Sequence, residues 1–386
     1  MRKIVHICAT TFTDGMAYQE NLLTKYHVKS GHAVTVITST WQYNTEGKLV
    51  ENEKEDYVNQ DNVHVRRLKL KGKNNITRKF RKFEKMYDVL CEEKPDILFI
   101  HGFQYLDILV VAKYIKDKRI KHVYIDNHAD YSNSATTWLS KNIQHRIIWK
   151  YCVQQIEPYA EKFYGVLPAR VDILTELYGL PKEKCELLVM GADDELVDMA
   201  EQNMIIEGIR KKYHIAKEDF LIVTGGKIDR WKTQTVMLEQ AVSRWKRNKV
   251  KLLIFGSIAA ELKEQILSLC NENIQYVGWL SVEDSYKVIA AADLAVYPGR
   301  HSTLWEQTIG QGIPMVVKHW EGTHHVDAGG NVEFLYQDST DEIENILRGI
   351  VFDRKKYETM KKEAEKVQGE FLYSNIAKES IMLEEG

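Results

Sequence analysis

Short, mostly apolar runs recur along the chain, and longer stretches with one apolar face separate them. Near-continuous apolar runs are typical of strands buried on both faces of a parallel sheet. Their alternation with amphipathic stretches predicts the α/β class. In the first half of the chain, this pattern predicts strands at residues 4–8, 33–38, 63–68, 97–100 and 122–125.

Helices are predicted between these strands. Residues 15–29 place Leu22, Leu23 and Tyr26 on one face, and Gly31 follows as a helix end. A second, basic helix is predicted over residues 76–91.

The pattern breaks near residue 195 and then restarts. Further strands are predicted at residues 220–223, 251–255, 274–277, 294–297 and 315–317, with helices between them. We therefore predict two α/β domains, each with a mainly parallel sheet, over residues 1–195 and 196–365. Residues 366–386 are predicted as a C-terminal helix.

Composition narrows the class of protein. The 386 residues suit two domains, and the chain is 44% hydrophobic and 28% charged. We expect neither a membrane span nor a signal peptide, because no apolar run is long enough and the N-terminus reads as a strand. Five scattered cysteines favour reduced thiols and a cytoplasmic location.

A basic segment interrupts the otherwise balanced charge. Between Arg66 and Lys85 lie ten cationic side chains and one acidic side chain, Glu84. Such a segment can bind an anionic membrane surface, a phosphorylated acceptor or nucleic acid, or it can be a solvated loop and helix face. Its centre, Arg78, Lys79, Arg81 and Lys82, interleaves with Phe80 and Phe83, which suits either an interfacial contact or a buried helix face.

Two common nucleotide motifs are absent from the sequence. The first strand-to-helix turn lacks Gly-x-Gly-x-x-Gly, and Gly226-Lys227 lacks the spacing of a Walker A loop. This excludes an ordinary dinucleotide dehydrogenase and an ordinary P-loop enzyme.

Two other loops in the second half follow predicted strands and suit anions. Gly226, Lys227 and Lys232 follow the strand that ends at residue 223, and glycine there lets backbone N–H groups approach a diphosphate. Ser302 and Thr303 precede a helix as natural N-caps, and Glu306 lies on its first turn. Each of these features also has a plain structural explanation, as a glycine turn with surface lysines or as helix capping.

Histidines form a third group of candidates. His128 follows the strand at residues 122–125, and Asp126, His128 and Asp130 make only a weak metal-ligand set. His319, His324 and His325 are interpreted as an ordinary polar loop.

In collinear order, several segments resemble the retaining glycosyltransferases of the GT-B fold, specifically family 4 (glycosyl transferases group 1). The resemblance covers nearly the whole chain. The segments are Asp14-Gly15 through Val36-Ile37, Lys94-Pro95-Asp96-Ile97, Gly226-Lys227 with Lys232, Gly278-Trp279-Leu280, and Glu306-Gln307 through Val316-Val317.

The resemblance implies two facing Rossmann-like domains, with the C-terminal helix docking back across the space between them. It also implies transfer of a sugar from a nucleotide sugar to an acceptor hydroxyl, with retention of configuration and without a cofactor or a bound metal. Lys227 and Lys232 would stabilise the departing diphosphate, and His128 would bind the donor sugar near the reaction centre. Donor binding is further assigned to Gly15, Gly226, Leu280, His301, Ser302, Thr303 and Glu306, with Glu306 holding ribose.

One departure from the family pattern affects the donor sugar. The family carries a second glutamate eight positions before Glu306, where this chain has Pro298. His301 or Arg300 is a candidate substitute.

The resemblance places the acceptor on residues 1–195 and the donor, a UDP- or GDP-sugar, on residues 196–365. Assembly of a bacterial-type surface glycan is the expected role, with a glycan, a lipid-linked molecule or another hydroxyl compound as acceptor. We expect no nucleic-acid partner, and a peripheral contact with the inner face of the membrane remains open. Two alternatives also stay open: a sugar-nucleotide epimerase on the same fold, and a non-catalytic protein that binds nucleotide sugars or glycans.

Overall fold

The computed structural model describes residues 1–44, 48–72, 80–230, 232–245 and 249–382. The chain divides into two compact units. Unit 1 comprises Met1–Val189 and Ile376–Gly386, and unit 2 comprises Met190–Asn375. The division therefore falls at residue 190 instead of 196, and the predicted terminal helix is split, because residues 366–375 belong to unit 2.

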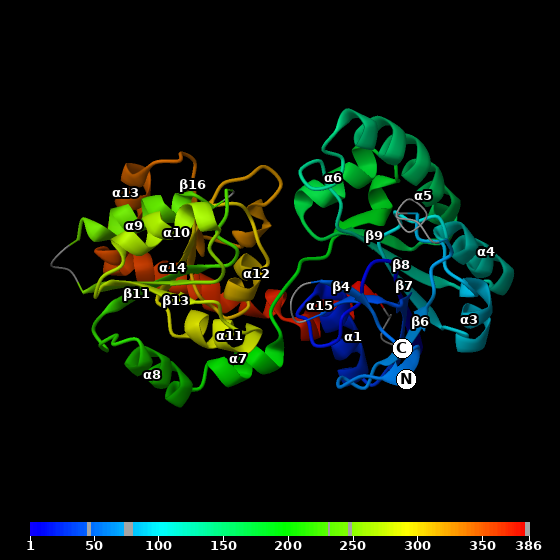
Figure 1. Cartoon of the computed structure of the whole chain (residues 1–386), viewed down its shortest axis with the longest axis horizontal. Helices are drawn as coiled ribbons and strands as arrows, with labels where there is room; N and C mark the ends of the chain where they lie inside the picture. The colour runs from blue at the N-terminus through cyan, green and yellow to red at the C-terminus, as the bar shows by residue number, and fades with distance from the viewer. Residues whose placement is uncertain (45–47, 73–79, 231, 246–248, 383–386) are drawn as a thin grey trace. The chain divides into compact units, whose positions relative to one another are not determined.

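Unit 1 is built on one sheet of eight strands in the order β10-β9-β8-β7-β1-β2-β6-β5 (Figure 1). All neighbouring pairs are parallel except β5 and β6. Along the chain the strands are β1 Lys3–Cys8, β2 Ala33–Ser39, β5 Asp56–Val58, β6 His64–Leu68, β7 Ile97–His101, β8 His122–Asn127, β9 Lys162–Gly165 and β10 Cys185–Leu187. A separate hairpin pairs β3 (Trp41–Tyr43) with β4 (Leu49–Glu51).

The sheet of unit 1 is buried by helices. They are α1 Gln19–Lys29, α3 Met86–Glu93, α4 Ile108–Lys118, the π-helix η1 Ser140–Trp149, α5 Lys150–Ile156 and α6 Pro168–Glu176, with short 3₁₀ turns η2 Glu157–Tyr159 and η3 Lys182–Lys184. The predicted helix over residues 76–91 is confirmed from Met86 onward but is wrong for residues 80–85, because helix begins only at Met86. Lys85 before it has a left-handed backbone, and Phe83 pairs with Leu70 in an isolated bridge.

Unit 2 is built on a parallel sheet in the order β13-β12-β11-β14-β15-β16. Its strands are β11 Phe220–Gly225, β12 Val250–Phe255, β13 Ile274–Gly278, β14 Leu294–Tyr297, β15 Met315–Lys318 and β16 Val332–Leu335. The helices are α7 Asp194–Ala200, α8 Asn203–Lys212, α9 Gln234–Ser243, α10 Ala260–Leu269, α11 Val282–Ala290, α12 Leu304–Ile309, α13 Thr340–Val351 and α14 Arg354–Val367, with 3₁₀ turns η4 His324–Val326 and η5 Gln368–Phe371. Helix α15 (Tyr373–Ser380) leads from unit 2 into unit 1.

Each unit has its own apolar core around its sheet. The central strands β1, β7, β11 and β14 are almost wholly buried, which explains why their sequences read as apolar runs. The predicted α/β class with two parallel-sheet domains is thus confirmed. Among the described residues, none of the helices combines the length and the apolar character that a membrane crossing requires.

Candidate functional site

In unit 2, the loops that follow two neighbouring strands come together. Strands β11 and β14 are adjacent, with β12 and β13 on one side and β15 and β16 on the other, so the strand order reverses between them. In open parallel sheets, ligands bind beyond the carboxyl ends of the strands at such a switch point. The two loops there are the ones that the sequence indicated, after Gly225 and after Tyr297.

Lys232 connects these two loops. Its Nζ atom donates to the Gly225 carbonyl at 3.2 Å and to Ser302 Oγ at 3.5 Å. Burial lowers the pKa of the Lys232 ammonium to about 8. A cation held at this edge of the sheet suits an anionic ligand such as a nucleotide diphosphate.

Gly226 makes room for that lysine. Its φ of +104° is in the range that favours glycine, and an added Cβ would lie 2.8 Å from Lys232 Nζ. Gly256, at the end of β12, is required for a similar reason, because its Cβ would lie 2.0 Å from the Gly226 carbonyl oxygen. Gly256 therefore allows two backbone segments to approach closely, and Gly226 leaves space for the Lys232 side chain.

The second predicted lysine has a different environment. The side chain of Lys227 is 80% exposed, and its Nζ lies 3.8 Å from Asp229 Oδ2. Lys227 is therefore free to reach a ligand at the surface, whereas Lys232 is held in place. Leu280 is half-buried beside the exposed Trp279, after Gly278 with a φ of +85°.

Glu306 is fully buried on α12, where it forms a cluster with two histidines. Its Oε1 accepts hydrogen bonds from His301 Nε2 at 2.7 Å and from His325 Nε2 at 2.9 Å. Burial alone would raise the pKa of Glu306, but His301 and His325 outweigh it and lower that pKa. Glu306 Oε2 has no hydrogen-bond partner among the described residues. The predicted contact with ribose would use this atom, which neighbouring groups cover.

Two local predictions in this region are wrong. Thr303 occupies the N-cap position of α12, but no side chain among the described residues caps this helix; the Ser302 hydroxyl faces Lys232 instead. His325 is not part of an ordinary polar loop, because its side chain is 3% exposed and bonded to Glu306. Sequence reasoning missed this contact because 19 residues separate the two side chains.

In unit 1, His128 lies just beyond the end of β8 and is partly exposed. Its Nε2 atom lies 3.4 Å from Oδ2 of Asp126, a fully buried carboxylate. Burial opposes protonation of His128, but Asp126 outweighs this effect and raises the pKa of His128. The same Oδ2 pairs with His101 Nδ1 at 2.6 Å, and Oδ1 accepts from the Gly102 N–H at 3.1 Å.

A chain of buried histidines continues from Asp126. His101 Nε2 lies 2.9 Å from His6 Nδ1, and His6 Nε2 lies 3.0 Å from His27 Nδ1. His27 Nε2 then lies 2.9 Å from the Ala377 carbonyl oxygen of α15. Burial is the main cause that lowers the pKa of His6, and it lowers the pKa of His27 to about 3, so both rings are neutral at pH 7.

The direction of each hydrogen bond in this chain is fixed by its end. A carbonyl oxygen only accepts, so His27 Nε2 carries a proton and His27 Nδ1 accepts from His6. His6 Nδ1 must then accept from His101 Nε2. Burial would raise the pKa of Asp126, but His101 and His128 outweigh it and lower that pKa, so the carboxylate is ionised. His101 therefore donates to His6 from Nε2 and to the Asp126 carboxylate from Nδ1.

The sequence carried a weak signal for these residues. His6 and His101 interrupt otherwise apolar strands, and His27 lies on α1 among buried residues. A polar residue at a buried strand position needs a partner, but the sequence cannot say which one. The sequence analysis therefore did not predict this row of hydrogen-bonded histidines.

Asp130 does not join this cluster. Its Oδ1 accepts from Ser132 and Asn133, and its Oδ2 accepts from Arg170 Nε at 3.0 Å. The set Asp126, His128 and Asp130 is therefore not assembled as a metal site. Within the described part of the chain, two groups have donor atoms that a divalent cation could use: His101, Asp126 and His128, and His301, Glu306 and His325. Their closest N–O distances, 2.6–2.9 Å, are those of hydrogen bonds, which account for both clusters without an ion.

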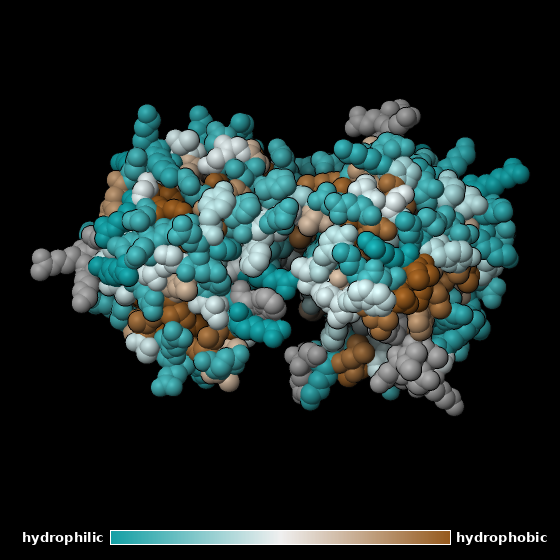
Figure 2. Space-filling view, turned by 90° about the horizontal axis from the view of Figure 1, so that it is seen from above, coloured by the Kyte–Doolittle hydropathy of each residue, from teal (hydrophilic) through white to brown (hydrophobic). Residues whose placement is uncertain are grey.

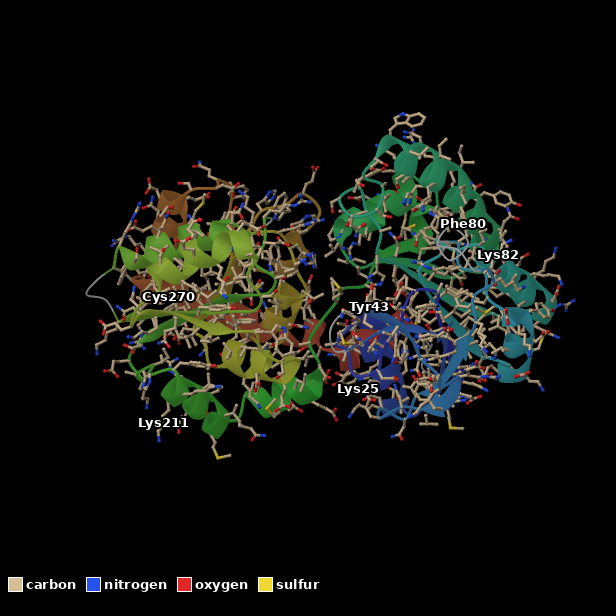
Figure 3. The ribbon with its side chains drawn as sticks, viewed as in Figure 1. Lys25, Tyr43, Phe80, Lys82, Lys211 and Cys270 are labelled. Carbon is tan, nitrogen blue, oxygen red and sulfur yellow. The ribbon has the colours of Figure 1, made fainter. Side chains whose placement is uncertain are left out.

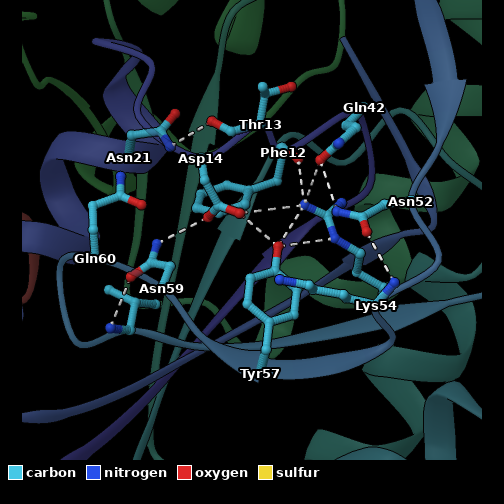
Figure 4. Close-up of polar contacts among 12 residues, drawn as sticks. Phe12, Thr13, Asp14, Asn21, Gln42, Asn52, Lys54, Tyr57, Asn59 and Gln60 are labelled. Atoms are coloured by element: carbon cyan, nitrogen blue, oxygen red, sulfur yellow. Dashed lines mark hydrogen bonds and ion pairs between the residues drawn. The ribbon is translucent and has the colours of Figure 1, made fainter. Parts of the chain in front are cut away.

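The loop after β1 is shaped by polar contacts to Asp14 (Figure 4). Tyr57 donates to Asp14 Oδ2 at 2.6 Å, and Asn59 donates to Oδ1 at 3.0 Å. Gly15, predicted at the donor site, follows with a φ of +74°. The buried Arg67 guanidinium donates to Tyr57 and to the backbone carbonyls of this region.

Much of the predicted basic segment has a structural role. Arg66 forms ion pairs with Glu92 and Glu93, and Lys69 pairs with Glu55. Phe80, labelled in Figure 3 with the exposed Lys82, packs against Trp149 with ring centroids 6.2 Å apart. Arg81 is half-buried, Phe83 is buried, and Arg78 and Lys79 lie outside the described residues. The interfacial interpretation of Phe80 and Phe83 is therefore wrong.

Comparison with known proteins gives family matches to both halves. Residues 14–196 match the model of Glycosyltransferase Family 4, and residues 205–367 match the model of Glycosyl transferases group 1. A search of curated proteins found no match.

Solved structures similar in fold cover almost the whole chain. HepE of Anabaena in complex with UDP is 14% identical over 98% of both chains, with a TM-score of 0.70. WaaG, a glycosyltransferase involved in lipopolysaccharide biosynthesis, is 15% identical over 99% of this chain and 100% of its own, with a TM-score of 0.65. UDP-GlcNAc 2-epimerase from Neisseria meningitidis, bound to UDP-GlcNAc, is 12% identical over 98% and 99%, with a TM-score of 0.62.

Proposed function

The chain belongs to glycosyltransferase family 4, and we propose that it is a retaining enzyme that transfers a hexosyl unit from a UDP-sugar to an acceptor hydroxyl. The observation that carries the proposal is Lys232, held between Gly225 and Ser302 at the switch point of the unit 2 sheet. The UDP in the similar HepE structure and the UDP-GlcNAc in the similar epimerase support uridine as the nucleoside of the donor.

In the proposed reaction, an acceptor oxygen bonds to the anomeric carbon as the bond from that carbon to the UDP oxygen breaks. The acceptor proton passes to the departing phosphate oxygen. Negative charge grows on the diphosphate, and a preorganised cation stabilises it more than it stabilises the bound donor. We assign this role to Lys232, with Lys227 contributing from the exposed side.

His128 is the residue of unit 1 that we assign to the donor sugar. Asp126 favours the protonated ring, so His128 presents an N–H donor to a sugar hydroxyl. The buried His101 beside Asp126 lowers the pKa of that carboxyl and keeps it ionised. None of these steps uses a protein nucleophile, and we propose that none uses a metal.

The sugar-binding glutamate of the family is absent at Pro298, and we assign its place to His301. Glu306 accepts from His301 Nε2, which leaves the Nδ1 side of the ring for a sugar hydroxyl. For the acceptor, similarity to WaaG, which is involved in lipopolysaccharide biosynthesis, supports a role in surface glycan assembly. We propose that this assembly takes place at the cytoplasmic side of a membrane.

Ligand-dependent stability tests the donor site. In a thermal-shift series with UDP, GDP, ADP and their sugars, we expect UDP compounds to raise the melting temperature of the wild type. Lys232→Met should abolish the shift, whereas Lys211→Met, on the exposed surface of α8, should retain it. If no nucleotide shifts a folded wild type, the donor site is refuted.

Product analysis distinguishes sugar transfer from epimerisation. Epimerisation is the alternative activity because an epimerase is among the similar structures. With a UDP-sugar and an acceptor glycan, a transferase releases UDP and lengthens the acceptor. An epimerase converts the sugar without any acceptor. A binding protein does neither, although UDP shifts its melting temperature.

A further inference from the structure

An exposed apolar ridge runs along the helical segment after His128. It consists of Trp138, Leu139, Ile143, Ile147 and Tyr151, whose exposed fractions are 73%, 65%, 38%, 58% and 56%. We call it the 138–151 ridge. Single exposed apolar residues are ordinary, but a contiguous set on one face marks an interaction surface.

The ridge is not needed for the packing of its own helix. The opposite face of η1 and α5 supplies the core of unit 1 with Trp149, Cys152, Val153 and Ile156, all at most 2% exposed. This segment therefore has two apolar faces, of which one is buried and one is not. In Figure 1 it lies along the edge of unit 1, and Figure 2, viewed from that side, shows hydrophobic residues at the surface.

Helix geometry aligns the ridge. Leu139, Ile143, Ile147 and Tyr151 recur every four residues. Ser140–Trp149 is a π-helix, whose turns hold more residues than those of an α-helix, and α5 follows. Over four residues, a π-helix rotates by slightly less than one full turn and an α-helix by slightly more. The two deviations partly cancel, so the four side chains stay on one face.

Within the segment that carries the ridge, the charged residues have one sign. Between Tyr131 and Ile156 the sequence has Lys141, Arg146 and Lys150 and neither aspartate nor glutamate. Arg146 is exposed, and Lys141 and Lys150 are half-buried. Tryptophan at one end and tyrosine at the other are typical of side chains that lie where lipid chains meet head groups.

A second copy of the chain is a poorer occupant than a lipid surface. A two-fold contact would place the ridge against itself and bring two sets of cations together, with no carboxylate in the segment to pair them. An anionic bilayer buries the apolar side chains and pairs the cations at the same time.

We propose that the 138–151 ridge is the surface by which this protein lies on an anionic lipid bilayer. The proposal deepens the proposed function and rests on it in one respect, the delivery of a lipid-linked acceptor. Trp138 lies only ten residues beyond His128 in the same unit, so a bilayer at the ridge presents its acceptor to the unit that carries the sugar-binding histidine.

Vesicle co-sedimentation of the full chain tests the surface without any donor or acceptor. We expect binding to phosphatidylcholine vesicles that contain phosphatidylglycerol and weak binding to phosphatidylcholine alone. The double variant Trp138→Ser, Ile147→Ser should lower partitioning by about tenfold or more. Arg146→Glu should lower it by a similar factor, and added salt should mimic this effect.

Matched controls come from unit 2. Met204→Ser removes an apolar side chain that is 75% exposed on α8, and Lys211→Glu reverses an exposed charge there. Both should bind vesicles as the wild type does. Unchanged melting temperatures would show that the ridge variants fold, as expected for exposed side chains.

Two outcomes would overturn the proposal. One is a wild type that does not bind anionic vesicles, and the other is ridge variants that bind them as strongly as the wild type does. A concentration-dependent dimer that the ridge variants lose would assign the ridge to a second copy instead. UDP-induced thermal shifts are measured separately from vesicle binding. A negative vesicle result therefore does not refute the donor site, and a negative UDP result does not refute the lipid-binding role of the ridge.

Discussion

At the scale of single residues, this chain uses burial to set the charge of its candidate catalytic groups. Lys232 is desolvated, and its pKa falls to about 8. Asp126 and Glu306 are fully buried, and each is ionised because two histidines face it. The balance between desolvation and a nearby opposite charge decides each case.

The first prediction concerns Lys232. A protonated Lys232 binds the UDP diphosphate, so UDP affinity should be highest below pH 8 and should fall as pH rises through the pKa of about 8. Lys232→Met should weaken UDP binding by about 10–100-fold, the value of a charge-assisted hydrogen bond, and should remove this pH dependence. Calorimetric titration with UDP from pH 6.5 to 9.5 measures both effects.

Lys232→Met should also stabilise the unliganded protein. Below pH 8 the folded state holds a cation that prefers water, and the substitution removes that cost, about 1–3 kcal/mol in the free energy of unfolding. A variant that loses both stability and UDP binding would point to a structural role for Lys232.

The second prediction concerns His101. His101→Asn removes the ring that shares the Asp126 carboxylate with His128, so His128 becomes the main histidine facing it. The pKa of His128 should rise, which histidine NMR titration measures directly. Ser380→Ala, which removes a contact to His27 at the far end of the chain, should leave that pKa unchanged. An equal pKa in His101→Asn and in the wild type would refute the positioning role.

At the scale of elements, the loops at the strand ends carry the candidate site residues, and the helices hold these loops in position. The loops after β11 and β14 meet because these strands are neighbours in space, although β12 and β13 lie between them in sequence. The loop after β11 can turn there only because Gly226 and Gly256 lack side chains. Glycine thus supports the site through space as well as through backbone freedom.

The third prediction compares a glycine of the candidate site with a glycine on an exposed helix outside it. Gly226→Ala strains a backbone with a φ of +104° and places a Cβ 2.8 Å from Lys232 Nζ, so UDP binding should fall by about tenfold or more through displacement of the ammonium. Gly208→Ala on α8 has no heavy atom within 4 Å of the new Cβ and should raise stability by about 0.5–1 kcal/mol. Thermal unfolding with and without UDP distinguishes the two variants.

At the scale of the whole molecule, stability should depend on pH through a group outside the site. Glu239 on α9 is fully buried, and neither carboxyl oxygen has a hydrogen-bond partner among the described residues. Burial raises its pKa to about 8. The folded state therefore keeps a proton that the unfolded chain releases near pH 4.3.

The fourth prediction follows from this difference. Between about pH 4.3 and 8 the folded state binds more protons at Glu239 than the unfolded state does, so this residue makes stability fall as pH rises through that window. Glu239→Gln should flatten the fall and should raise the free energy of unfolding at pH 7.5 by about 2–3 kcal/mol. Denaturant unfolding at pH 5 and pH 7.5 measures the change, and an equal effect at both pH values would contradict the assignment.

By itself, the sequence determined the class and the position of most central strands. Strands such as β1, β7 and β11 are buried on both faces of the sheet. Burial on both faces requires apolar side chains at successive positions, and such runs are visible in the sequence. It also identified Gly226, Lys232 and Glu306 as candidates, because strand ends and collinear motifs are local features. Short edge strands such as β5 and β10 escaped notice because they bury few side chains.

Only the tertiary structure decided which side chains meet. His6, His27 and His101 lie on different elements, and α15 closes their chain from a position 350 residues beyond His27. His325 reaches Glu306 from beyond β15. The sequence does not distinguish the apolar residues of the 138–151 ridge from core residues; the fold shows that another face of the helix fills the core. Partner choice and exposure depend on distant chain segments packing together, and no local pattern encodes them.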